Sequence, residues 1–233
     1  KEIADITNSE VIGNGEIKIK NIAFDSRTIY STKHTAFLAI NTKKNSGHKY
    51  IDSVIEKGIE TIITENKIDN LSINQIITKN SVEFLQTLAK YHFEHSAINS
   101  IGITGSNGKT ILKEWLYQCL SNEFVTVKSP KSFNSQIGLP LSLFQIEKKH
   151  DLGIFEVGIS KPDEMDNQEN IFHPKIGLLT HIGSAHSANF SSEEELINEK
   201  LKLFKNSEII FYNADNLLTD KIINELYSSK KLI

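Results

Sequence analysis

Residues 101–110 of this 233-residue chain combine glycines, a lysine and a threonine in a spacing that could hold a phosphate group. The apolar run 101–104 predicts a strand, and the glycine-bounded segment 105–108 predicts a tight turn that opens a helix. Backbone N–H groups at the start of a helix attract an anion, Lys109 could reach terminal phosphates, and the Thr110 hydroxyl suits Mg²⁺. These residues therefore predict a nucleotide phosphate site.

The loop departs in one respect from the common P-loop pattern, which would place a glycine where this chain has Ile103. Its form is the shorter G-S-N-G-K-T. The alternative interpretation is a strand, a turn and a helix in which Lys and Thr follow the glycines by chance. On the nucleotide interpretation, the expected contacts are Thr104, Gly105, Ser106, Asn107, Gly108, Lys109 and Thr110.

Glu156 closes an otherwise apolar predicted strand, 152–157, where a buried carboxylate is costly unless it has a partner. Mg²⁺ held by Thr110 would supply that partner, because Mg²⁺ binds few protein oxygens together with phosphates and water. The alternative is that Glu156 pairs with a lysine or caps a neighbouring helix. The sequence leaves both interpretations open.

A lysine falls inside the apolar face of another predicted helix. Ser192 and Glu195 form a capping box, which predicts a helix from Ser192 to about Lys205. Lys200 lies within the apolar arc of that helix. Such a lysine either extends its stem to water or is a functional lysine with a lowered pKa.

The elements that must position these residues alternate strand and helix from residue 98 onward, which favours a mostly parallel sheet covered on both faces. In such sheets, ligands gather beyond the carboxyl ends of the strands. Loop 105–108, Glu156 and the segment 180–186 all follow predicted strands, so we expect them at one sheet edge. The expected strands are 100–104, 124–127, 152–157, 176–180 and 208–213.

The residues before this region predict a separate, smaller α/β module. Its expected strands are 17–24, 35–40, 59–64 and 75–78, and its expected helices are 50–57 and 80–95. The polar triplet 25–27, Asp-Ser-Arg, is compatible with a plain turn. The expected fold class is α/β, with a small N-terminal α/β domain at 1–97 and a P-loop domain with a mostly parallel sheet at 98–233.

The bulk composition argues against several classes of partner. The net charge is −3 and charged residues make up 24% of the chain, so no basic field favours nucleic acid. No apolar run reaches the roughly 18 residues of a membrane helix and no signal peptide opens the chain, which indicates a cytoplasmic protein. Cys119, the single cysteine, cannot form an internal disulfide and is expected to pack on the apolar face of the helix after the phosphate loop. The residues expected on that face are Ile111, Leu112, Trp115, Leu116, Cys119 and Leu120.

Six motifs follow one another along the chain: T-G-S-N-G-K-T (104–110), S-P-K-S-F-N-S-Q-I-G-L-P-L-S-L (129–143), F-E-V-G-I-S (155–160), T-H-I-G-S-A-H (180–186), E-K-L-K-L-F (199–204) and N-A-D-N (213–216). Together they resemble the Mur ligases of peptidoglycan synthesis. Upstream, D-S-R (25–27) and G-H-K-Y-I (47–51) resemble the UDP-binding domain of the members that add the third residue or the terminal dipeptide. The stretch S-F-N-S-Q-I-G-L-P (132–140) is most similar to the dipeptide-adding members, and closest to the ligase half of the bifunctional ligase and alanine racemase chains of Bacteroidetes-type bacteria.

The resemblance implies ATP-dependent amide ligation with two Mg²⁺ ions. ATP would phosphorylate the terminal carboxylate of a UDP-N-acetylmuramoyl-tripeptide, and the amine of D-alanyl-D-alanine would attack the resulting acyl phosphate. By this resemblance the catalytic residues are Lys109, His186 and Lys200, and the metal ligands are Thr110, Glu156, His186 and Lys200, with Lys200 carbamylated by CO₂. The implied substrate contacts are Ser26, Arg27 and Asn134, while Asn213 would lie on the adenine side.

The chain also departs from the family pattern. His181 and Ser135 stand where asparagine is common, and no third domain follows to bind the incoming amine, so we expect a fragment with little ligase activity. The other functions that remain open are a third-residue-adding Mur ligase, a relative of folylpolyglutamate synthase, a small kinase and a non-catalytic nucleotide-binding module.

Overall fold

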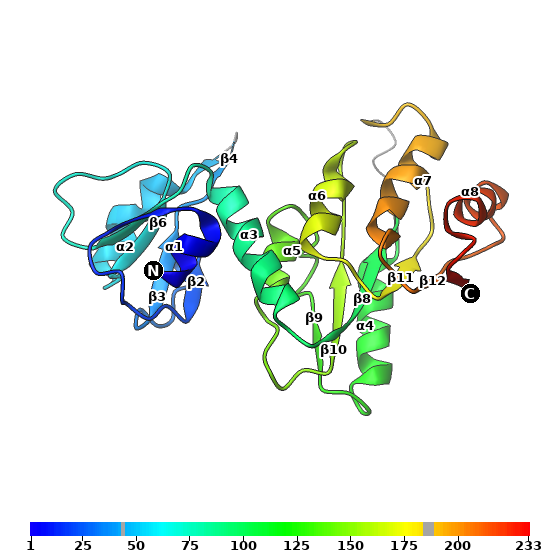
Figure 1. The fold of residues 1–233 in the computed structure, drawn as a ribbon, viewed down its shortest axis with the longest axis horizontal. Coiled ribbons are helices and arrows are strands. Elements are labelled where there is room, and N and C mark those ends of the chain that lie inside the picture. The colour runs from blue at the N-terminus through cyan, green and yellow to red at the C-terminus, as the bar shows by residue number, and fades with distance from the viewer. Residues whose placement is uncertain (43–44, 184–188) are drawn as a thin grey trace. The chain divides into compact units, whose positions relative to one another are not determined.

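The computed structural model describes residues 1–42, 45–183 and 189–233, and the chain divides into two compact units, Lys1–Leu88 and Ala89–Ile233 (Figure 1). The division falls inside helix α3 (Ser81–Glu94), upstream of the junction at residue 97 expected from the sequence. Within the described ranges, no helix combines the length and the apolar character that a bilayer crossing requires.

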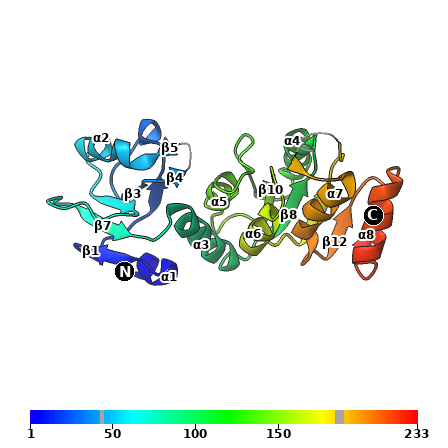
Figure 2. The same ribbon diagram turned by 90° about the horizontal axis from the view of Figure 1, so that it is seen from above.

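The first unit is built on a five-stranded sheet with the order β1-β7-β6-β3-β2. Strand β1 runs antiparallel to β7, as Figure 2 shows, and the other pairings in this sheet are parallel. The elements of the unit before α3 are α1 (Glu2–Thr7), β1 (Glu10–Ile12), β2 (Asn21–Ala23), η1 (Ser26–Thr28), β3 (Thr35–Leu38), β4 (Asn41–Thr42), β5 (Asn45–Ser46), η2 (Gly47–Tyr50), α2 (Ile51–Glu56), β6 (Thr61–Thr64) and β7 (Asn74–Ile77).

The expected strands and helices of this unit are present, with shorter bounds. The strand expected at 17–24 is reduced to β2, because only residues 21–23 pair with β3. Helix α3 begins where the sequence indicated, since the side chain of Asn80 accepts hydrogen bonds from the N–H groups of Val82 and Glu83 at 2.9 and 3.1 Å. Helix α1 and strand β1 were not anticipated, because three to six residues are too few for a clear periodic pattern.

The second unit contains a six-stranded sheet with the order β13-β12-β11-β8-β10-β9, in which every described pairing is parallel. The prediction of a parallel-sheet α/β domain is confirmed. The elements are β8 (Asn99–Thr104), α4 (Lys109–Leu120), β9 (Thr126–Lys128), α5 (Gly138–Leu143), β10 (Leu152–Glu156), α6 (Glu164–Ile171), β11 (Ile176–Leu179), α7 (Glu193–Leu201), η4 (Lys202–Phe204), β12 (Ile209–Phe211), α8 (Leu217–Tyr227) and β13 (Lys231–Leu232).

The strand order changes direction around β8. The chain leaves β8 for β9 and β10 on one side and then crosses to β11, β12 and β13 on the other. Connections that diverge in this way leave a crevice at the carboxyl end of the strand between them, which is where open α/β sheets bind ligands. The loop after β8 occupies this position.

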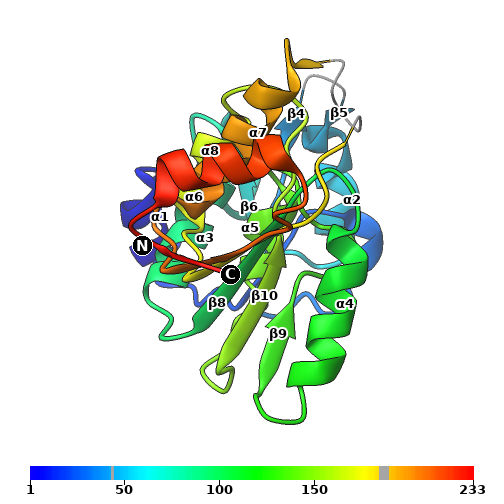
Figure 3. The same cartoon turned by 90° about the vertical axis from the view of Figure 1, so that its right-hand side faces the viewer.

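The two faces of this sheet bury different clusters. On one face, Ile103 and Ile154 pack against Leu112 and Leu116 of α4. On the other face, Phe155 belongs to a larger cluster with residues of α5, α6, α7 and α8. Figure 3 shows α4 on the opposite side of the sheet from α6, α7 and α8. Because β10 is covered on both faces, its residues 152–155 form a continuous apolar run.

The buried face of α4 differs from the one expected. Leu112, Leu116 and Leu120 face the sheet, but Ile111 is 58% and Trp115 is 64% exposed. The prediction that Cys119 packs inside is wrong, since this free cysteine is exposed. The face predicted from apolar character alone therefore differs from the buried face in the structure. The buried face includes a polar residue, Lys113, which is described below.

Candidate nucleotide-binding site

Two glycines shape the loop between β8 and α4. Gly105 has φ +139° and Gly108 has φ +85°, both in the region that side-chain-bearing residues rarely adopt. A Cβ on Gly105 would lie 2.0 Å from Thr180 Oγ1, whereas a Cβ on Gly108 would meet nothing within 4 Å. The loop is therefore tightly packed on one side and open at the start of α4, where helix N–H groups can face an anion.

Segment 180–183, which follows β11, anchors the loop. The Ser106 N–H donates to the His181 carbonyl at 2.9 Å, and the Ser106 hydroxyl donates to the Gly183 carbonyl at 3.1 Å. The Thr104 hydroxyl is fully buried and has no hydrogen-bond partner among the described residues. Asn107 is exposed. The structure thus joins the ends of β8 and β11, as their shared sheet edge requires.

Lys109 folds back over the loop that precedes it. Its Nζ donates to the carbonyls of Gly105 and Ser106 at 2.7 and 3.2 Å. Burial lowers the pKa of Lys109 from its ordinary value, and the charge of Glu156 opposes that shift. Because loop carbonyls are modest partners for an ammonium group, phosphate oxygens could replace them without leaving the charge unpaired.

Thr110, Glu156 and Asn134 meet beside this lysine. Glu156 Oε2 accepts from the Thr110 hydroxyl at 3.1 Å and from Asn134 Nδ2 at 3.3 Å. The Ser132 hydroxyl lies 3.2 Å from the Thr110 hydroxyl. The carboxyl end of β10 and the first turn of α4 therefore bring hydroxyl, amide and carboxylate groups to one point.

This group of residues fits a magnesium ion. The Glu156 side chain is fully buried, and its Oε1 is ion-paired with Lys113 Nζ at 3.1 Å. Among the described residues, its Oε2 accepts from two neutral groups, the Thr110 hydroxyl and the Asn134 amide. A buried carboxylate oxygen with neutral partners is stabilised further by a cation beside it. Mg²⁺ takes carboxylate and hydroxyl oxygens together with phosphates, and Thr110 and Glu156 supply that donor set.

Lys113 is a site residue that the sequence interpretation missed. It is fully buried one turn after Thr110, and its Nζ lies 3.1 Å from Glu156 Oε1 and 2.9 Å from the Ser129 carbonyl. The expected alternative for Glu156, a pairing with a lysine, is thus present in the structure. The sequence pattern could have indicated the burial of Lys113, because this residue lies on the same helical arc as Leu116 and Leu120.

Lys200 reaches the same loop from α7. Its side chain is 1% exposed, and its Nζ donates to the Gly105 carbonyl at 3.2 Å. Burial, and then the nearby charge of Lys109, lowers the pKa of Lys200 to about 8. The capping of α7 was also foreseen, since the Ser192 hydroxyl accepts from the Glu195 N–H at 3.1 Å. Of the two interpretations of Lys200, the geometry favours a buried lysine with a lowered pKa.

The lowered pKa of Lys200 predicts a pH-dependent stability. Below about pH 8 the folded and unfolded chains both carry the proton, and burial of the charge destabilises the fold. Between pH 8 and 10.5 the folded chain loses its proton first, so the free energy of unfolding rises with pH, by about 3 kcal/mol in total from this residue. We expect Lys200→Met to be more stable than wild type at pH 7 and to lose that advantage by pH 10 in urea unfolding.

The control for this prediction is Lys221→Met, which changes a lysine whose side chain is 70% exposed. Its stability difference from wild type should not vary with pH over the same range. An unfolding free energy that follows the same pH curve in wild type and in Lys200→Met would contradict the prediction.

Three of the expected contacts are not joined to this site by any described interaction. Asn213 is exposed and its side chain accepts from the Asp215 N–H, which closes a local turn after β12. Ser26 and Arg27 belong to the first unit, where Asp25 binds Arg27 through Nε and Nη2 at 2.9 and 2.8 Å. His186, expected to bind the second metal, lies outside the described residues.

The Asp-Ser-Arg turn of the first unit is held firmly. Lys57 Nζ donates to the Ser26 carbonyl at 2.6 Å, and hydrogen bonds from Arg27 lower the pKa of Asp25 to about 2. The Arg27 side chain is nevertheless 86% exposed. The turn thus presents a guanidinium group whose orientation is fixed on one side by a carboxylate.

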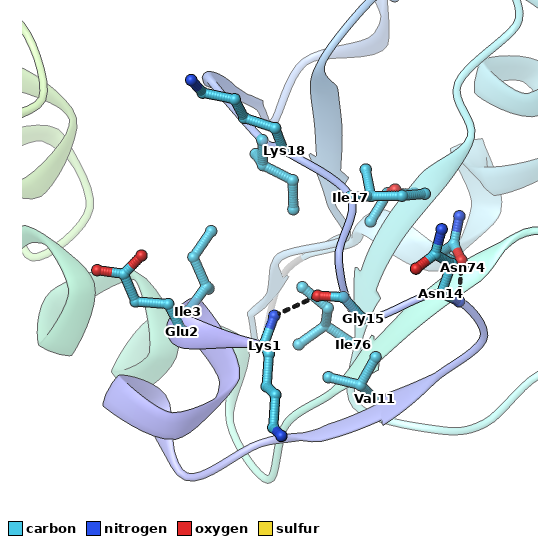
Figure 4. Close-up of a pocket in the computed structure, with 12 residues that line it drawn as sticks. Lys1, Glu2, Ile3, Val11, Asn14, Gly15, Ile17, Lys18, Asn74 and Ile76 are labelled. Atoms are coloured by element: carbon cyan, nitrogen blue, oxygen red, sulfur yellow. Dashed lines mark hydrogen bonds between the residues drawn. The ribbon is translucent and has the colours of Figure 1, made fainter.

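A separate cavity of about 220 Å³ lies elsewhere in the first unit (Figure 4). Lys1 donates from its backbone nitrogen to the Gly15 carbonyl at its rim, and the Asn14 N–H donates to Asn74 Oδ1. Ser26 and Arg27 do not line it. Its walls mix five aliphatic side chains with polar and charged residues, and none of the predicted site residues lines it.

A cluster of carboxylates also lies beside α7. Asp163, Asp166 and Glu199 are close enough together to hold a metal ion. Lys202 already pairs with Asp166 at 2.6 Å and with Glu199 at 2.7 Å. Because an ammonium group already compensates two of the three carboxylates, we assign no metal to this cluster.

Comparison with known protein families identifies the second unit. Residues 103–232 match the family described as the Mur ligase middle domain. A relative from Borreliella burgdorferi named UDP-N-acetylmuramoyl-tripeptide--D-alanyl-D-alanine ligase is 33% identical over 88% of this chain and 47% of its own length. The Bacillus subtilis protein of the same name is 27% identical over 86% of this chain and 44% of its own length. The chain thus spans about half the length of these curated relatives.

Solved structures agree with this match. MurF from Acinetobacter baumannii superposes on the whole chain with a TM-score of 0.90 and 26% identity, and the match covers 51% of that protein. MurF ligase from Thermotoga maritima, solved in complex with ADP, superposes on 94% of the chain with a TM-score of 0.81 and 26% identity, covering 51% of that protein. Both units of the fold are therefore shared with these structures.

Proposed function

Because this chain belongs to the Mur ligase family, we propose that it forms the UDP-substrate-binding and ATP-binding portion of a UDP-N-acetylmuramoyl-tripeptide D-alanyl-D-alanine ligase. The observation that carries this proposal is the meeting of Lys109, Thr110, Glu156 and Lys200 around one phosphate-type loop. Relatives that carry this name, and MurF structures, match most of the chain. The same comparisons support an enzyme of the carbon–nitrogen ligase type that acts in peptidoglycan synthesis.

The proposed reaction has two steps. A carboxylate oxygen of the tripeptide attacks the γ-phosphorus of ATP, and the bond between that phosphorus and the β–γ bridging oxygen breaks. The products of this step are ADP, which carries the bridging oxygen, and the acyl phosphate of the tripeptide. The amine of D-alanyl-D-alanine then attacks the acyl carbon, an amide bond forms, phosphate leaves, and the amine loses a proton. Phosphoryl transfer of this kind needs positioning and charge stabilisation more than covalent help from the protein.

The residues of the second unit have distinct roles in this scheme. Lys109 exchanges its loop carbonyls for the β- and γ-phosphate oxygens and neutralises their charge. Thr110 and Glu156 would hold the first Mg²⁺, and we assign the second to Lys200 and His186. When bound, Mg²⁺ supplies charge stabilisation on the transferring phosphoryl oxygens. The buried end of β10 keeps Glu156 in place, and Asn134 fixes the carboxylate while facing the peptide substrate.

We further propose that Lys200 is carbamylated. CO₂ adds only to a neutral amine, which releases a proton and leaves a carboxylate-like group. Burial and a pKa of about 8 make a much larger fraction of the Lys200 amine neutral near physiological pH than the ordinary lysine pKa of 10.5 allows. A carbamate there would place metal-binding oxygens beside the Gly105 carbonyl that Lys200 now contacts.

Other parts of the proposal rest on the sequence motifs. Ser26 and Arg27 are assigned to the UDP group, for which an exposed guanidinium is suited, and Asn213 to the adenine side. Kinship with chains that carry a fused alanine racemase is supported by residues 132–140. The proposed location is the cytoplasm, where UDP-linked precursors and ATP are available and where a free cysteine such as Cys119 stays reduced.

Calorimetry on this chain tests the proposal. We expect a non-hydrolysable ATP analogue to bind about ten-fold more tightly with Mg²⁺ than with EDTA. We expect UDP-N-acetylmuramoyl-tripeptide to bind in a separate titration, and UDP-N-acetylglucosamine to bind more weakly because it lacks the peptide. An absence of nucleotide binding, or a nucleotide affinity unaffected by Mg²⁺, would reject the ATP site; equal affinities for the two UDP compounds would reject the peptide specificity.

A further inference from the structure

Lys113 occupies a cage of oxygen atoms under the phosphate loop. Its Nζ donates to the Ser129 carbonyl at 2.9 Å and to the Lys131 carbonyl, and it lies 3.1 Å from both Glu156 Oε1 and Glu114 Oε1. Two carbonyls and two carboxylates are the kind of ligand set that Ca²⁺ takes in proteins. Here the Lys113 ammonium group fills that position.

Lys113 gives the two carboxylate oxygens of Glu156 different partners. Oε1 lies beside the ammonium group, while Oε2 accepts from the Thr110 hydroxyl and from Asn134. With Oε1 held by a fixed charge, one oxygen of the carboxylate is left for a cation. A single carboxylate oxygen suits the small, strictly octahedral Mg²⁺, whereas Ca²⁺ gains more from both oxygens and from additional carbonyls.

Lys113 also shapes the loop that follows β9. It binds the carbonyls of Ser129 and Lys131, and Lys131 has φ +50°, a left-handed conformation that costs a residue with a side chain about 1 kcal/mol or more. The next residues, Ser132 and Asn134, are those that reach Thr110 and Glu156. The two carbonyl contacts therefore hold this loop against the cation side of the phosphate site.

We propose that Lys113 is a positioning residue that sets the cation preference of the nucleotide site, by reserving Glu156 Oε1 and the carbonyls of Ser129 and Lys131 and leaving Glu156 Oε2 for Mg²⁺. The inference rests on the proposed function, because it presumes that a nucleotide binds here with a divalent cation. No part of it requires the peptide substrate or the ligation step.

The test compares Lys113→Met with Lys128→Met. Lys128 pairs with the other oxygen of Glu114 and lies 4.0 Å over the Tyr117 ring, so it shares the charge network without contacting Glu156. Binding of the ATP analogue is measured by calorimetry with Mg²⁺, with Ca²⁺ and with EDTA. We expect the ratio of the Mg²⁺ affinity to the Ca²⁺ affinity to fall about ten-fold in Lys113→Met and to stay as in wild type in Lys128→Met.

A role of Lys113 confined to stability would lower the two affinities together and leave their ratio unchanged, which would overturn the inference. Lys113→Met leaves the buried Glu156 charge without its ammonium, so we also expect the melting temperature of this variant to rise more with Mg²⁺ or Ca²⁺ than that of wild type. If Lys113→Met does not fold even with these cations, Lys113→Gln carries the same expectation for the ratio. Failure of wild type to bind nucleotide would reject the proposed function instead.

Discussion

Replacement of Lys109 by methionine is expected to weaken ATP binding about 1,000-fold, equivalent to about 4 kcal/mol. Among the described residues, its ammonium group donates to two carbonyls of the loop, those of Gly105 and Ser106. Phosphate oxygens would gain a charge-assisted contact with this ammonium group. A methionine of similar length would leave the negative charge of the phosphate uncompensated. Calorimetric titration of the ATP analogue into both proteins, with Mg²⁺ present, measures the difference.

The matched control is Lys221→Met on α8, where the lysine is exposed and pairs loosely with Glu225. Its ATP affinity should equal that of wild type. Because burial lowers the pKa of Lys109, Lys109→Met should be at least as stable as wild type toward urea. A loss of ATP affinity below about five-fold in a folded Lys109→Met protein would refute the role assigned to this lysine.

The charges around the loop explain why a polyanion suits it. Lys109 and Lys200 both donate to the Gly105 carbonyl, and the charge of Lys109 contributes to the lowered pKa of Lys200. Glu156 compensates Lys113 first, since the two lie 3.1 Å apart. Three lysines thus converge beside one buried carboxylate at the start of a helix, and a bound phosphate chain would relieve their mutual repulsion.

Much of this site could be predicted from the sequence, because its parts follow strands. Gly105, Lys109 and Thr110 lie within one six-residue segment, so their proximity follows from local geometry. Glu156 and Lys200 lie far from them in sequence, but each is a charged residue in an apolar pattern. Glu156 lies at the end of an apolar strand, and Lys200 lies in the apolar arc of a helix. A polar residue in an apolar pattern often marks a functional position.

The remainder depended on tertiary contacts. Apolar character placed Ile111 and Trp115 of α4 inside, but the helix instead buries Lys113, whose burial depends on oxygens from Glu156 and the loop after β9. A helical wheel contains no information about such partners. Likewise, the shortness of β2 depends on which residues pair with β3. The Asp-Ser-Arg triplet is compatible with a turn, but the triplet alone does not indicate the contact between Arg27 and Asp25.

The second large effect is expected for Gly105→Ala, which should destabilise the protein by about 3 kcal/mol and abolish measurable ATP binding. The added methyl would lie 2.0 Å from Thr180 Oγ1 and 3.1 Å from the Thr180 backbone carbon, at φ +139°. Relief requires the end of β11 to move away from β8, although the Thr180 N–H and hydroxyl both bind the Thr104 carbonyl. Urea unfolding and calorimetry measure the two losses.

The matched control is Gly108→Ala, because a Cβ there meets nothing within 4 Å and carries only the strain of φ +85°. Its cost to stability should be about 1 kcal/mol. Removal of the clashing hydroxyl in the double variant Gly105→Ala/Thr180→Ala should restore part of the stability, with a coupling energy of about 1 kcal/mol or more. Equal destabilisation by the two glycine variants, together with no coupling, would show that the contact with Thr180 does not shape the loop. The phosphate site would then depend on the left-handed glycines and not on its attachment to β11.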